Sequence, residues 1–270
     1  MSHADDIAAA RTAELASRLD RVRSRIGAAC AAAGRDPAEV TLIAVTKTYP
    51  ASDVVALAAL GVTDFGENRD QEAAPKAAQV AEALPASGTA AATGADAAQA
   101  AGPGCAGTPV TWHFIGQLQS NKAHSVARYA DVVHSVDRMR LVRHLGAAAR
   151  DVAGRNAGGA PLTCLVQVSL DADPARGGVT AEGLLEVARA IHAQPGLALG
   201  GLMAIAPLGA DPATAFAPLR QLSARIRSVW DGAAIISAGM SGDLEAAIAA
   251  GATHLRIGTA LLGNRSVPVR

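Results

Sequence analysis

Lysine is scarce in this 270-residue chain, because only three of its 24 basic residues are lysines and the others are arginines. Arginine therefore serves as the general surface cation, and a remaining lysine is a candidate for chemistry that a guanidinium cannot perform. A buried ε-amine can lose its proton and condense with an aldehyde, whereas arginine stays protonated. Lys47 closes the apolar run 41–47. From that position alone, a strand-end lysine that reaches to water is an equally good interpretation.

Other features are also missing, and each absence excludes a class of protein. The three cysteines, Cys30, Cys105 and Cys164, are widely spaced and lack a CxxC pair, which argues against a disulfide framework and a zinc site. Zero net charge without runs of Lys or Arg argues against nucleic acid or an anionic membrane as partner. No apolar segment has the length of a membrane span, and the first fifteen residues do not read as a signal peptide. We therefore expect a cytoplasmic protein.

The pattern of apolar residues predicts one long helix followed by alternating strands and helices. Leu15, Leu19, Val22 and Ile26 recur at helical spacing, and this first helix is expected to end near Gly34 and Pro37. After it come eight short apolar or β-rich runs, each followed by a turn signal and an alanine-rich helical stretch. The predicted strands are 41–46, 63–66, 112–115, 132–136, 163–169, 199–205, 234–238 and 254–257.

Eight alternating units in a chain of this length predict a closed (β/α)8 barrel, a TIM barrel with an extra N-terminal helix. A doubly wound open sheet would show the same alternation, but it requires a glycine-rich phosphate loop after the first strand, where this chain has Lys47-Thr-Tyr-Pro50. We expect residues 1–270 to form a single domain. The segment 84–109, nearly all Ala, Gly, Thr, Ser and Pro, is expected to be a flexible surface insertion.

Two C-terminal motifs indicate a phosphate site. Ser241 lies in the glycine-containing turn after the seventh predicted strand, and Gly258 and Thr259 follow the eighth. Barrels of this type often bind phosphate with backbone N–H groups of these two loops. Either motif alone is better read as a turn or a helix cap, with Ser241 capping a helix that begins near Asp243. Their occurrence after adjacent strands favours phosphate binding.

The two ends of the chain meet in a closed barrel, because the first and eighth strands are neighbours. An aldehyde-reactive amine, Lys47, then shares one rim with the phosphate loops. Pyridoxal 5′-phosphate carries both an aldehyde and a phosphate, so it fits this arrangement. Arg256 precedes Gly258 by two residues and is expected to point to the same barrel face, where it could donate to the pyridine nitrogen.

At these residues the chain resembles the pyridoxal phosphate homeostasis protein family, single-domain relatives of the alanine racemase N-terminal barrel. The resemblance covers nearly the whole chain and rests on ordered motifs: Ile43-Ala-Val-Thr-Lys47, Phe65-Gly-Glu-Asn68, Trp112-His-Phe-Ile-Gly, Gly201-Leu-Met203, Gly239-Met-Ser241 and Arg256-Ile-Gly258-Thr259. It implies that Lys47 holds the cofactor as an aldimine, Asn68 lies near the ring or lysine, and Met203 lines the pocket. It further implies that Arg256 meets the pyridine nitrogen and that Ser241, Gly258 and Thr259 bind phosphate.

Some residues depart from the family pattern or receive a structural interpretation. Arg176 stands where the family commonly has a lysine, which puts a second Schiff-base lysine there in doubt, and Gln117 replaces a common proline. His113 has no carboxylate partner that the sequence identifies, so a structural role on its strand is favoured. Tyr49 precedes Pro50 and is expected to shape its loop.

Three functions remain open at this point. The resemblance favours a non-catalytic protein that holds pyridoxal phosphate and acts in its intracellular homeostasis or in its delivery to cofactor-dependent apoenzymes. Zero net charge and scattered apolar residues do not demand a dimer, and a monomer is preferred. A racemase-like enzyme would need a second acid/base group on the opposite face of the cofactor. A cofactor-free Schiff-base aldolase would use Lys47 directly on a sugar phosphate.

Overall fold

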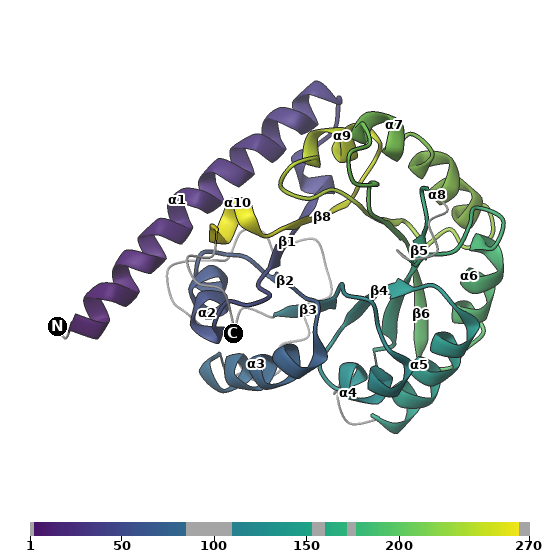
Figure 1. Cartoon of the computed structure of the whole chain (residues 1–270), viewed down its shortest axis with the longest axis horizontal. Helices are drawn as coiled ribbons and strands as arrows, with labels where there is room; N and C mark the ends of the chain where they lie inside the picture. The colour runs from purple at the N-terminus through teal and green to yellow at the C-terminus, as the bar shows by residue number, and fades with distance from the viewer. Residues whose placement is uncertain (1–2, 85–109, 153–159, 172–176, 265–270) are drawn as a thin grey trace.

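The computed structural model describes residues 3–84, 110–152, 160–171 and 177–264 (Figure 1). The predicted insertion therefore falls almost entirely outside the described residues, as do Cys105 and Arg176. No helix in the described ranges has both the length and the apolar character needed to cross a bilayer.

Eight parallel strands close into a barrel in chain order, which confirms the predicted barrel and shows that the open-sheet alternative is wrong. Each prediction corresponds to one observed strand, with shifts of one or two residues at some ends. The strands are β1 Thr41–Val45, β2 Asp64–Glu67, β3 Thr111–Phe114, β4 Val132–Val136, β5 Leu162–Val168, β6 Leu197–Ala204, β7 Ile235–Ser237 and β8 His254–Ile257. The register of β1 against β8 pairs Ile43 with Arg256 and Ala44 with Ile257, and this pairing closes the barrel.

Helices surround the barrel as an outer ring (Figure 1). They are α1 His3–Ala32, α2 Ala51–Ala59, α3 Asp70–Ala83, α4 Ala123–Ala127, α5 Met139–Asp151, α6 Leu184–His192, α7 Pro212–Phe216, α8 Leu219–Arg227, α9 Leu244–Ala249 and α10 Thr259–Leu262, with 3-10 turns at Pro37–Glu39 and Ser120–Lys122. Helices α2 to α6 follow one another counterclockwise in this view. Since such crossovers are right-handed, Figure 1 looks onto the carboxyl ends of the strands.

Helix α1 lies along the flank of the barrel beside α9 and α10, and its N-terminal end projects past them (Figure 1). Its predicted apolar stripe is buried, since Leu15, Leu19, Val22 and Ile26 are at most 5% exposed. Arg11 also links three elements, because its guanidinium donates to the Asp53 carboxylate on α2 and to the Leu262 carbonyl on α10. The N-terminal helix is thereby attached to α2 and α10, the helices that follow β1 and β8.

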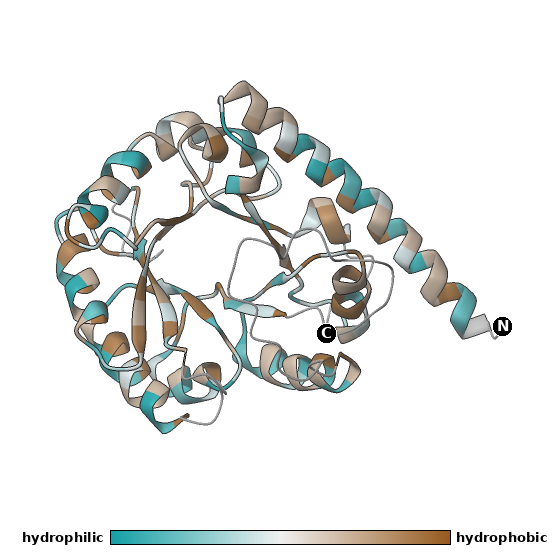
Figure 2. Cartoon of the chain, turned by 180° about the vertical axis from the view of Figure 1, so that it is seen from behind, coloured by the Kyte–Doolittle hydropathy of each residue, from teal (hydrophilic) through white to brown (hydrophobic). Residues whose placement is uncertain are grey.

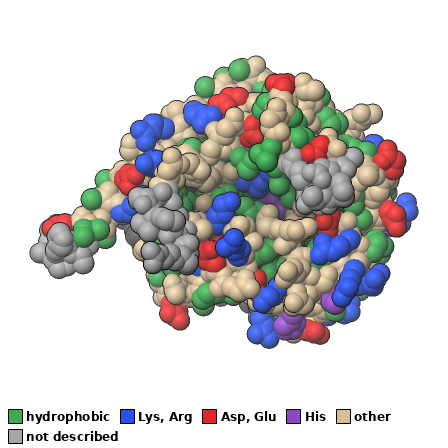
Figure 3. Space-filling view, viewed as in Figure 1, with side chains coloured by type: hydrophobic (Ala, Val, Ile, Leu, Met, Phe, Trp, Pro, Cys, Tyr) green, Lys and Arg blue, Asp and Glu red, His purple; other side chains and the backbone are tan. Residues whose placement is uncertain are grey.

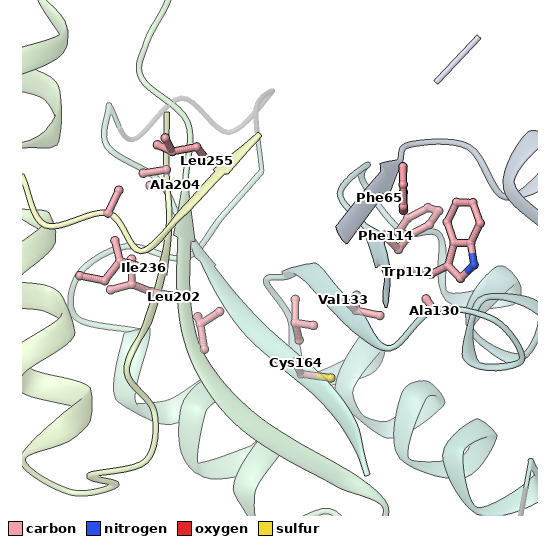
Figure 4. Packing of buried hydrophobic residues seen from close by; sticks show 14 of the residues in the cluster. Phe65, Trp112, Phe114, Ala130, Val133, Cys164, Leu202, Ala204, Ile236 and Leu255 are labelled. Carbon is pink, nitrogen blue, oxygen red and sulfur yellow. The ribbon is translucent and has the colours of Figure 1, made fainter. Parts of the chain in front are cut away.

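The main core lies between the strands and the helix ring. Figure 2 shows apolar residues concentrated on the strands, with polar residues frequent on the helices. Near β2 and β3 the core is aromatic: Phe65, Trp112 and Phe114 lie together (Figure 4), with the Phe65 and Trp112 ring centroids 6.0 Å apart. Burial of such a side chain contributes about 2 kcal/mol or more. These side chains pack outside the ring of strands, so the barrel interior is left to other side chains.

The barrel interior has a different composition. A small apolar cluster contains Val132, Leu165 and Met203, with Ile235 packed against it. Toward it project polar side chains that are almost fully buried, namely His113, His134, Ser237 and Arg256. Burial in this interior lowers the pKa of His134 well below its ordinary value, and it lowers the pKa of His254 to about 4. The folded protein therefore keeps both imidazoles neutral.

Stability should depend on pH because of these histidines. In the unfolded chain they titrate near the ordinary value of 6.5, so between about pH 6.5 and 4 the unfolded state binds more protons than the folded state. The free energy of unfolding should therefore fall as the pH falls through this window, by up to about 3 kcal/mol for His254. Urea unfolding at a series of pH values measures it. A His254→Leu variant should show a shallower decline, and an equal slope in both proteins would contradict the assignment.

The close approach of β6 and β7 predicts a second stability effect. Gly201 has φ +143°, and a Cβ built on it would lie 2.0 Å from the Ile235 carbonyl oxygen. Gly201→Ala should therefore reduce the free energy of unfolding by about 2–4 kcal/mol, through backbone strain and overpacking. Gly232→Ala is the matched control, because a Cβ there meets no atom within 4 Å. Denaturant unfolding should separate the two variants, and equal stabilities would refute the steric account.

Candidate functional site

Lys47 differs from the other two lysines in its surroundings. It lies just beyond the end of β1, after the buried Thr46, and its side chain is exposed. The Lys76 ammonium contacts the Glu67 carboxylate at 2.6 Å, and the Lys122 ammonium lies 3.7 Å from the Asp70 carboxylate. No hydrogen bond or ion pair joins the Lys47 side chain to another described residue. Its amine is therefore available to a ligand.

The backbone directly after Lys47 is strained. Thr48 has φ +71°, a left-handed conformation that a β-branched residue rarely adopts, and it is the one non-glycine residue with positive φ among those described. Its N–H donates to the Glu72 carboxylate on α3. Residues held in such conformations are concentrated at functional sites. The turn that presents Lys47 is thus kept in an unfavourable geometry by a contact from a neighbouring helix.

A polar cluster lies beneath this turn, composed of the buried Thr46, Glu67 and Lys76 and the partly exposed Glu72. The Glu67 carboxylate accepts hydrogen bonds from the Thr46 hydroxyl at 2.7 Å and from the Lys76 ammonium at 2.6 Å. Lys76 also donates to the Thr46 carbonyl at 2.8 Å, so it contacts the backbone next to Lys47 directly. Burial raises the pKa of Glu67, and the contacts with Lys76 and Thr46 oppose this rise. The cluster anchors the turn to α3.

Lys76 was not predicted from the sequence as part of the site. The scarcity of lysine was the one feature that could have drawn attention to it, and this scarcity applied to Lys76 as much as to Lys47. Its spacing of four residues from Glu72 predicts only a surface pair on a helix. The decisive contacts, with Glu67 at the end of β2 and with Thr46 after β1, depend on how the helix packs against the barrel.

Asn68 follows β2 directly and carries an unsatisfied polar atom. Its Oδ1 is buried and has no hydrogen-bond partner among the described residues. A buried amide oxygen without a partner costs free energy, so its presence points to a ligand or water that completes the site. The position of Asn68 depends on Gly116 after β3, because a Cβ at Gly116 would lie 2.1 Å from the Asn68 carbonyl oxygen.

The loops after β7 and β8 are joined by Ser241. Its hydroxyl accepts a hydrogen bond from the Ala260 N–H at 3.2 Å, in the first turn of α10. The expectation that Ser241 caps the following helix is therefore wrong: α9 begins at Leu244, and its N-cap residue is Asp243. The side chain instead connects the two loops that were expected to hold phosphate.

Gly258 is the N-cap residue of α10 and Thr259 is its first residue, and both leave donors outside the hydrogen-bond ladder of this helix. The first bonds of this helix run from Leu261 and Leu262 to the Gly258 carbonyl, so the N–H groups of Gly258 and Thr259 precede the ladder. Gly258 has φ −111°, and a Cβ built on it would meet its nearest neighbour, Val45, at an ordinary 3.5 Å. The protein fold alone does not require glycine here, and its small size leaves room for a ligand.

Tyr49 links the β1 loop to the end of α10. Its hydroxyl donates to the Gly263 carbonyl at 2.8 Å, and the Arg11 guanidinium carbon lies 5.8 Å from its ring centroid. The expected role of Tyr49 in shaping the loop is confirmed. Together with Ser241, it holds the loops after β1, β7 and β8 against one another at the carboxyl end of the barrel.

Arg256 crosses from β8 toward β6 inside this end of the barrel. It donates to the Ser237 hydroxyl at 2.7 Å, to the Ser237 carbonyl at 2.9 Å and to the Ala204 carbonyl at 2.9 Å. These bonds use three of the five N–H groups of a guanidinium, so two are left without an acceptor among the described residues. Burial lowers its pKa to about 10, and the group stays charged at neutral pH. Met203, 1% exposed, pairs with Ser237 in the next strand.

These groups form one site at the carboxyl end of the barrel. Within the described residues it contains an amine without a partner, an unsatisfied amide oxygen, open N–H groups at the start of α10 beside the Ser241 hydroxyl, and a guanidinium with spare donors. Figure 3 shows Lys and Arg side chains near the middle of this face. Such a donor set suits a ligand that carries a carbonyl group, a phosphate and a ring nitrogen. The β1–β8 pairing brings the two ends of the chain together: Lys47 follows β1, and Arg256 and the N–H groups of Gly258 and Thr259 belong to β8 and the turn after it.

Comparison with known proteins identifies the class of barrel to which the chain belongs. Residues 17–266 match the family described as alanine racemase, N-terminal domain. A solved alanine racemase from Corynebacterium glutamicum, 14% identical, shares the fold with a TM-score of 0.60 over 93% of this chain and 60% of that one. The alanine racemase type of barrel expected from the sequence is thus confirmed.

The chain belongs to the pyridoxal phosphate homeostasis protein family. Proteins of that name from Mycobacterium tuberculosis H37Rv and Pseudomonas aeruginosa are 42% and 40% identical to it, over 94% and 93% of this chain and 94% and 96% of theirs. The solved structure of PipY from Synechococcus elongatus, which has pyridoxal phosphate bound, is 31% identical, with a TM-score of 0.72 over 93% of this chain and all of that one. The resemblance proposed from the motifs is confirmed.

The buried cluster beneath Lys47 yields a prediction about stability. Lys76→Met removes the partner of a buried carboxylate and should reduce the free energy of unfolding by about 3–5 kcal/mol. Lys122→Met removes a half-exposed lysine from a longer ion pair and should cost less than about 1 kcal/mol. Thermal and urea unfolding compare the two. A double variant, Lys76→Met with Glu67→Leu, should recover part of the loss, and equal effects of the two single variants would contradict the role given to Lys76.

Proposed function

We propose that this protein holds pyridoxal 5′-phosphate at the carboxyl end of its barrel, with Lys47 as the covalent attachment residue. The observation that carries the proposal concerns Lys47, the one lysine without a partner among the described residues: it follows β1, beside the strand whose loop offers open N–H groups. The bound cofactor in PipY and the names of the close relatives support it.

The residues of the site suit each part of this cofactor. When bound, pyridoxal phosphate supplies an aldehyde that condenses reversibly with a primary amine and releases water. Lys47 provides the amine, and the strained turn at Thr48 orients it. Ser241, Gly258 and Thr259 bind the phosphate through hydroxyl and backbone N–H groups. Arg256 donates one of its spare N–H groups to the ring nitrogen, Met203 lines the pocket wall, and Asn68 lies beside the ring or the lysine.

Arg256 determines what kind of chemistry the site favours. A guanidinium only donates, so the ring nitrogen that it meets must accept and stay unprotonated. Many enzymes of this cofactor place an acidic partner at that position, which keeps the nitrogen protonated and the ring strongly electron-withdrawing. A guanidinium partner weakens the ring as an electron sink. The site is therefore better suited to retaining the cofactor than to breaking bonds at a substrate carbon.

The candidate proton carriers around Lys47 support a non-catalytic role. The Glu67 carboxylate accepts from Lys76 and Thr46, and the Tyr49 hydroxyl donates to a backbone carbonyl. The Glu72 carboxylate accepts from the Thr48 N–H and contacts Lys76 at 3.3 Å. Each makes a contact that helps to hold the loop after β1, and the one oxygen among them without a hydrogen-bond partner in the described residues is Glu67 Oε2. A racemase-like enzyme would need one of them, or a further residue, to exchange protons with a substrate.

A cofactor-free Schiff-base aldolase is the second candidate, because Lys47 and the phosphate loops would also suit a sugar phosphate. Two observations favour the cofactor. The spare donors of Arg256 lie in the barrel interior and suit a ring nitrogen. The buried Asn68 oxygen has no hydrogen-bond partner in the part of the chain that the structure describes, as expected beside a large ligand. We infer that the protein acts as a cytoplasmic reservoir or donor of the cofactor, with cofactor-dependent apoenzymes as recipients and a monomer as the working unit.

Loading the protein with pyridoxal phosphate tests this proposal. The wild-type protein should show a visible absorption band, and borohydride reduction followed by peptide mapping should place the label on Lys47. Lys47→Arg keeps the positive charge but cannot condense, so its band should be lost, whereas Lys122→Ala should leave it unchanged. Alanine added to the loaded protein should not be racemised. A label on another residue would overturn the assignment, and steady racemisation would overturn the non-catalytic role.

A further inference from the structure

Five polar side chains form a continuous hydrogen-bonded row through the barrel interior, here called the interior row. The row runs from Asp64 on β2 through His113 on β3, His134 on β4 and Ser237 on β7 to Arg256 on β8. Its four contacts measure 2.9 Å (Asp64 to His113), 2.8 Å (His113 to His134), 2.9 Å (His134 to Ser237) and 2.7 Å (Ser237 to Arg256). The expectation that His113 lacks a carboxylate partner is therefore wrong, since Asp64 is that partner.

The chemistry of the two ends determines the direction of every bond in the row. Arg256 can only donate, and an ionised Asp64 can only accept. The Ser237 hydroxyl accepts from Arg256, and the acceptor that the described residues offer to its own proton is His134 Nδ1, so the hydroxyl donates there. His134 donates from Nε2 to His113 Nδ1, and His113 donates from Nε2 to Asp64. Both imidazoles are therefore neutral and carry their proton on Nε2.

The electrostatics of the interior agree with this assignment. Burial alone would raise the pKa of Asp64, but hydrogen bonds from His113 and Thr63 lower it below its ordinary value, so the carboxylate is ionised. Asp64 also lines a pocket at the amino-terminal end of the barrel with Arg23 and Thr41. Burial, with further contributions from His113, Arg256 and His254, lowers the pKa of His134. A protonated His134 would donate from both nitrogens and would reverse the Ser237 hydroxyl.

The orientation of the Ser237 hydroxyl matters because it is one of the three acceptors that hold Arg256. The other two are backbone carbonyls, of Ser237 and Ala204, whose positions the strands determine. The hydroxyl is the one acceptor that could rotate, and its proton is directed away from Arg256 only while His134 accepts it. The guanidinium is thus held by a row that begins at Asp64, at the amino-terminal end of the barrel.

We propose that Asp64, His113 and His134 are positioning residues that orient the Ser237 hydroxyl and thereby aim the spare N–H groups of Arg256 at the ring nitrogen of a pyridine-type ligand. This inference rests on the proposed function, because that function supplies the ligand of Arg256. It adds that the electronic state of the bound ring depends on side chains that never touch it.

The first test uses the cofactor-free protein and so does not depend on the proposed function. Long-range proton–nitrogen NMR of histidine-labelled protein distinguishes the two neutral tautomers from the imidazolium. Signals assigned with His113→Asn and His134→Asn variants should show both side chains as Nε2–H tautomers at neutral pH. Either side chain protonated, or carrying its proton on Nδ1, would overturn the row.

The second test measures the loaded protein. His113→Leu removes the acceptor of His134, so the visible band should shift and affinity for pyridoxal phosphate should fall about tenfold, as for the loss of one well-placed hydrogen bond to a charged group. His113→Asn keeps an acceptor at the Nδ1 position and should restore both. The matched control is His254→Leu, which removes an interior imidazole whose ring bonds to Thr253, outside the row.

The outcomes separate the possible failures. If His113→Leu and His254→Leu shift the band equally, packing explains the effect and the proposal fails. If the wild-type protein shows no band, the proposed function fails while the NMR result still decides the state of the row. If His113→Leu does not fold, the His113→Asn variant and the NMR of the wild-type protein still test the proposal. A shifted visible band in His113→Asn, or a proton on Nδ1 of either histidine, would contradict it.

Discussion

The parallel pairing of β1 with β8 is the contact on which the site depends. It joins residues more than 200 positions apart, with Ile43 beside Arg256 and Ala44 beside Ile257. Without this closure, Lys47 and the phosphate loops would belong to opposite edges of an open sheet. Further hydrogen bonds hold in place the loops that this pairing brings together. Tyr49 and Ser241 connect the loops, and Arg11 fastens α1 across them.

Two sets of buried polar groups support the site, and they act on its two halves. The cluster of Thr46, Glu67, Glu72 and Lys76 holds the strained turn of Lys47, and the interior row holds Arg256. Buried polar groups are costly unless they are hydrogen-bonded, and nearly all of these groups have partners. The exceptions at the site, the Asn68 amide oxygen and one Glu67 oxygen, lie next to the turn that presents Lys47.

The sequence allowed the architecture to be predicted because the strands are short apolar runs separated by clear turn signals. Lys47 was found because it is both rare and placed after such a run. The contacts of Lys76, His113 and Ser241 could not be predicted in the same way. Their partners come from other strands and helices, and a hydrogen bond between distant elements leaves no periodic pattern. His113 shows this most clearly, since Asp64 lies 49 residues earlier and reaches it only across the β2–β3 pair.

The most direct test of this account is a crystal structure of the protein after incubation with pyridoxal phosphate. The account predicts continuous electron density from the Lys47 ammonium position to the ligand, the phosphate against Ser241, Gly258 and Thr259, and an Arg256 nitrogen within hydrogen-bonding distance of the ring nitrogen. Density attached to Lys76 or Lys122, or a ligand bound away from the carboxyl end of the barrel, would contradict it.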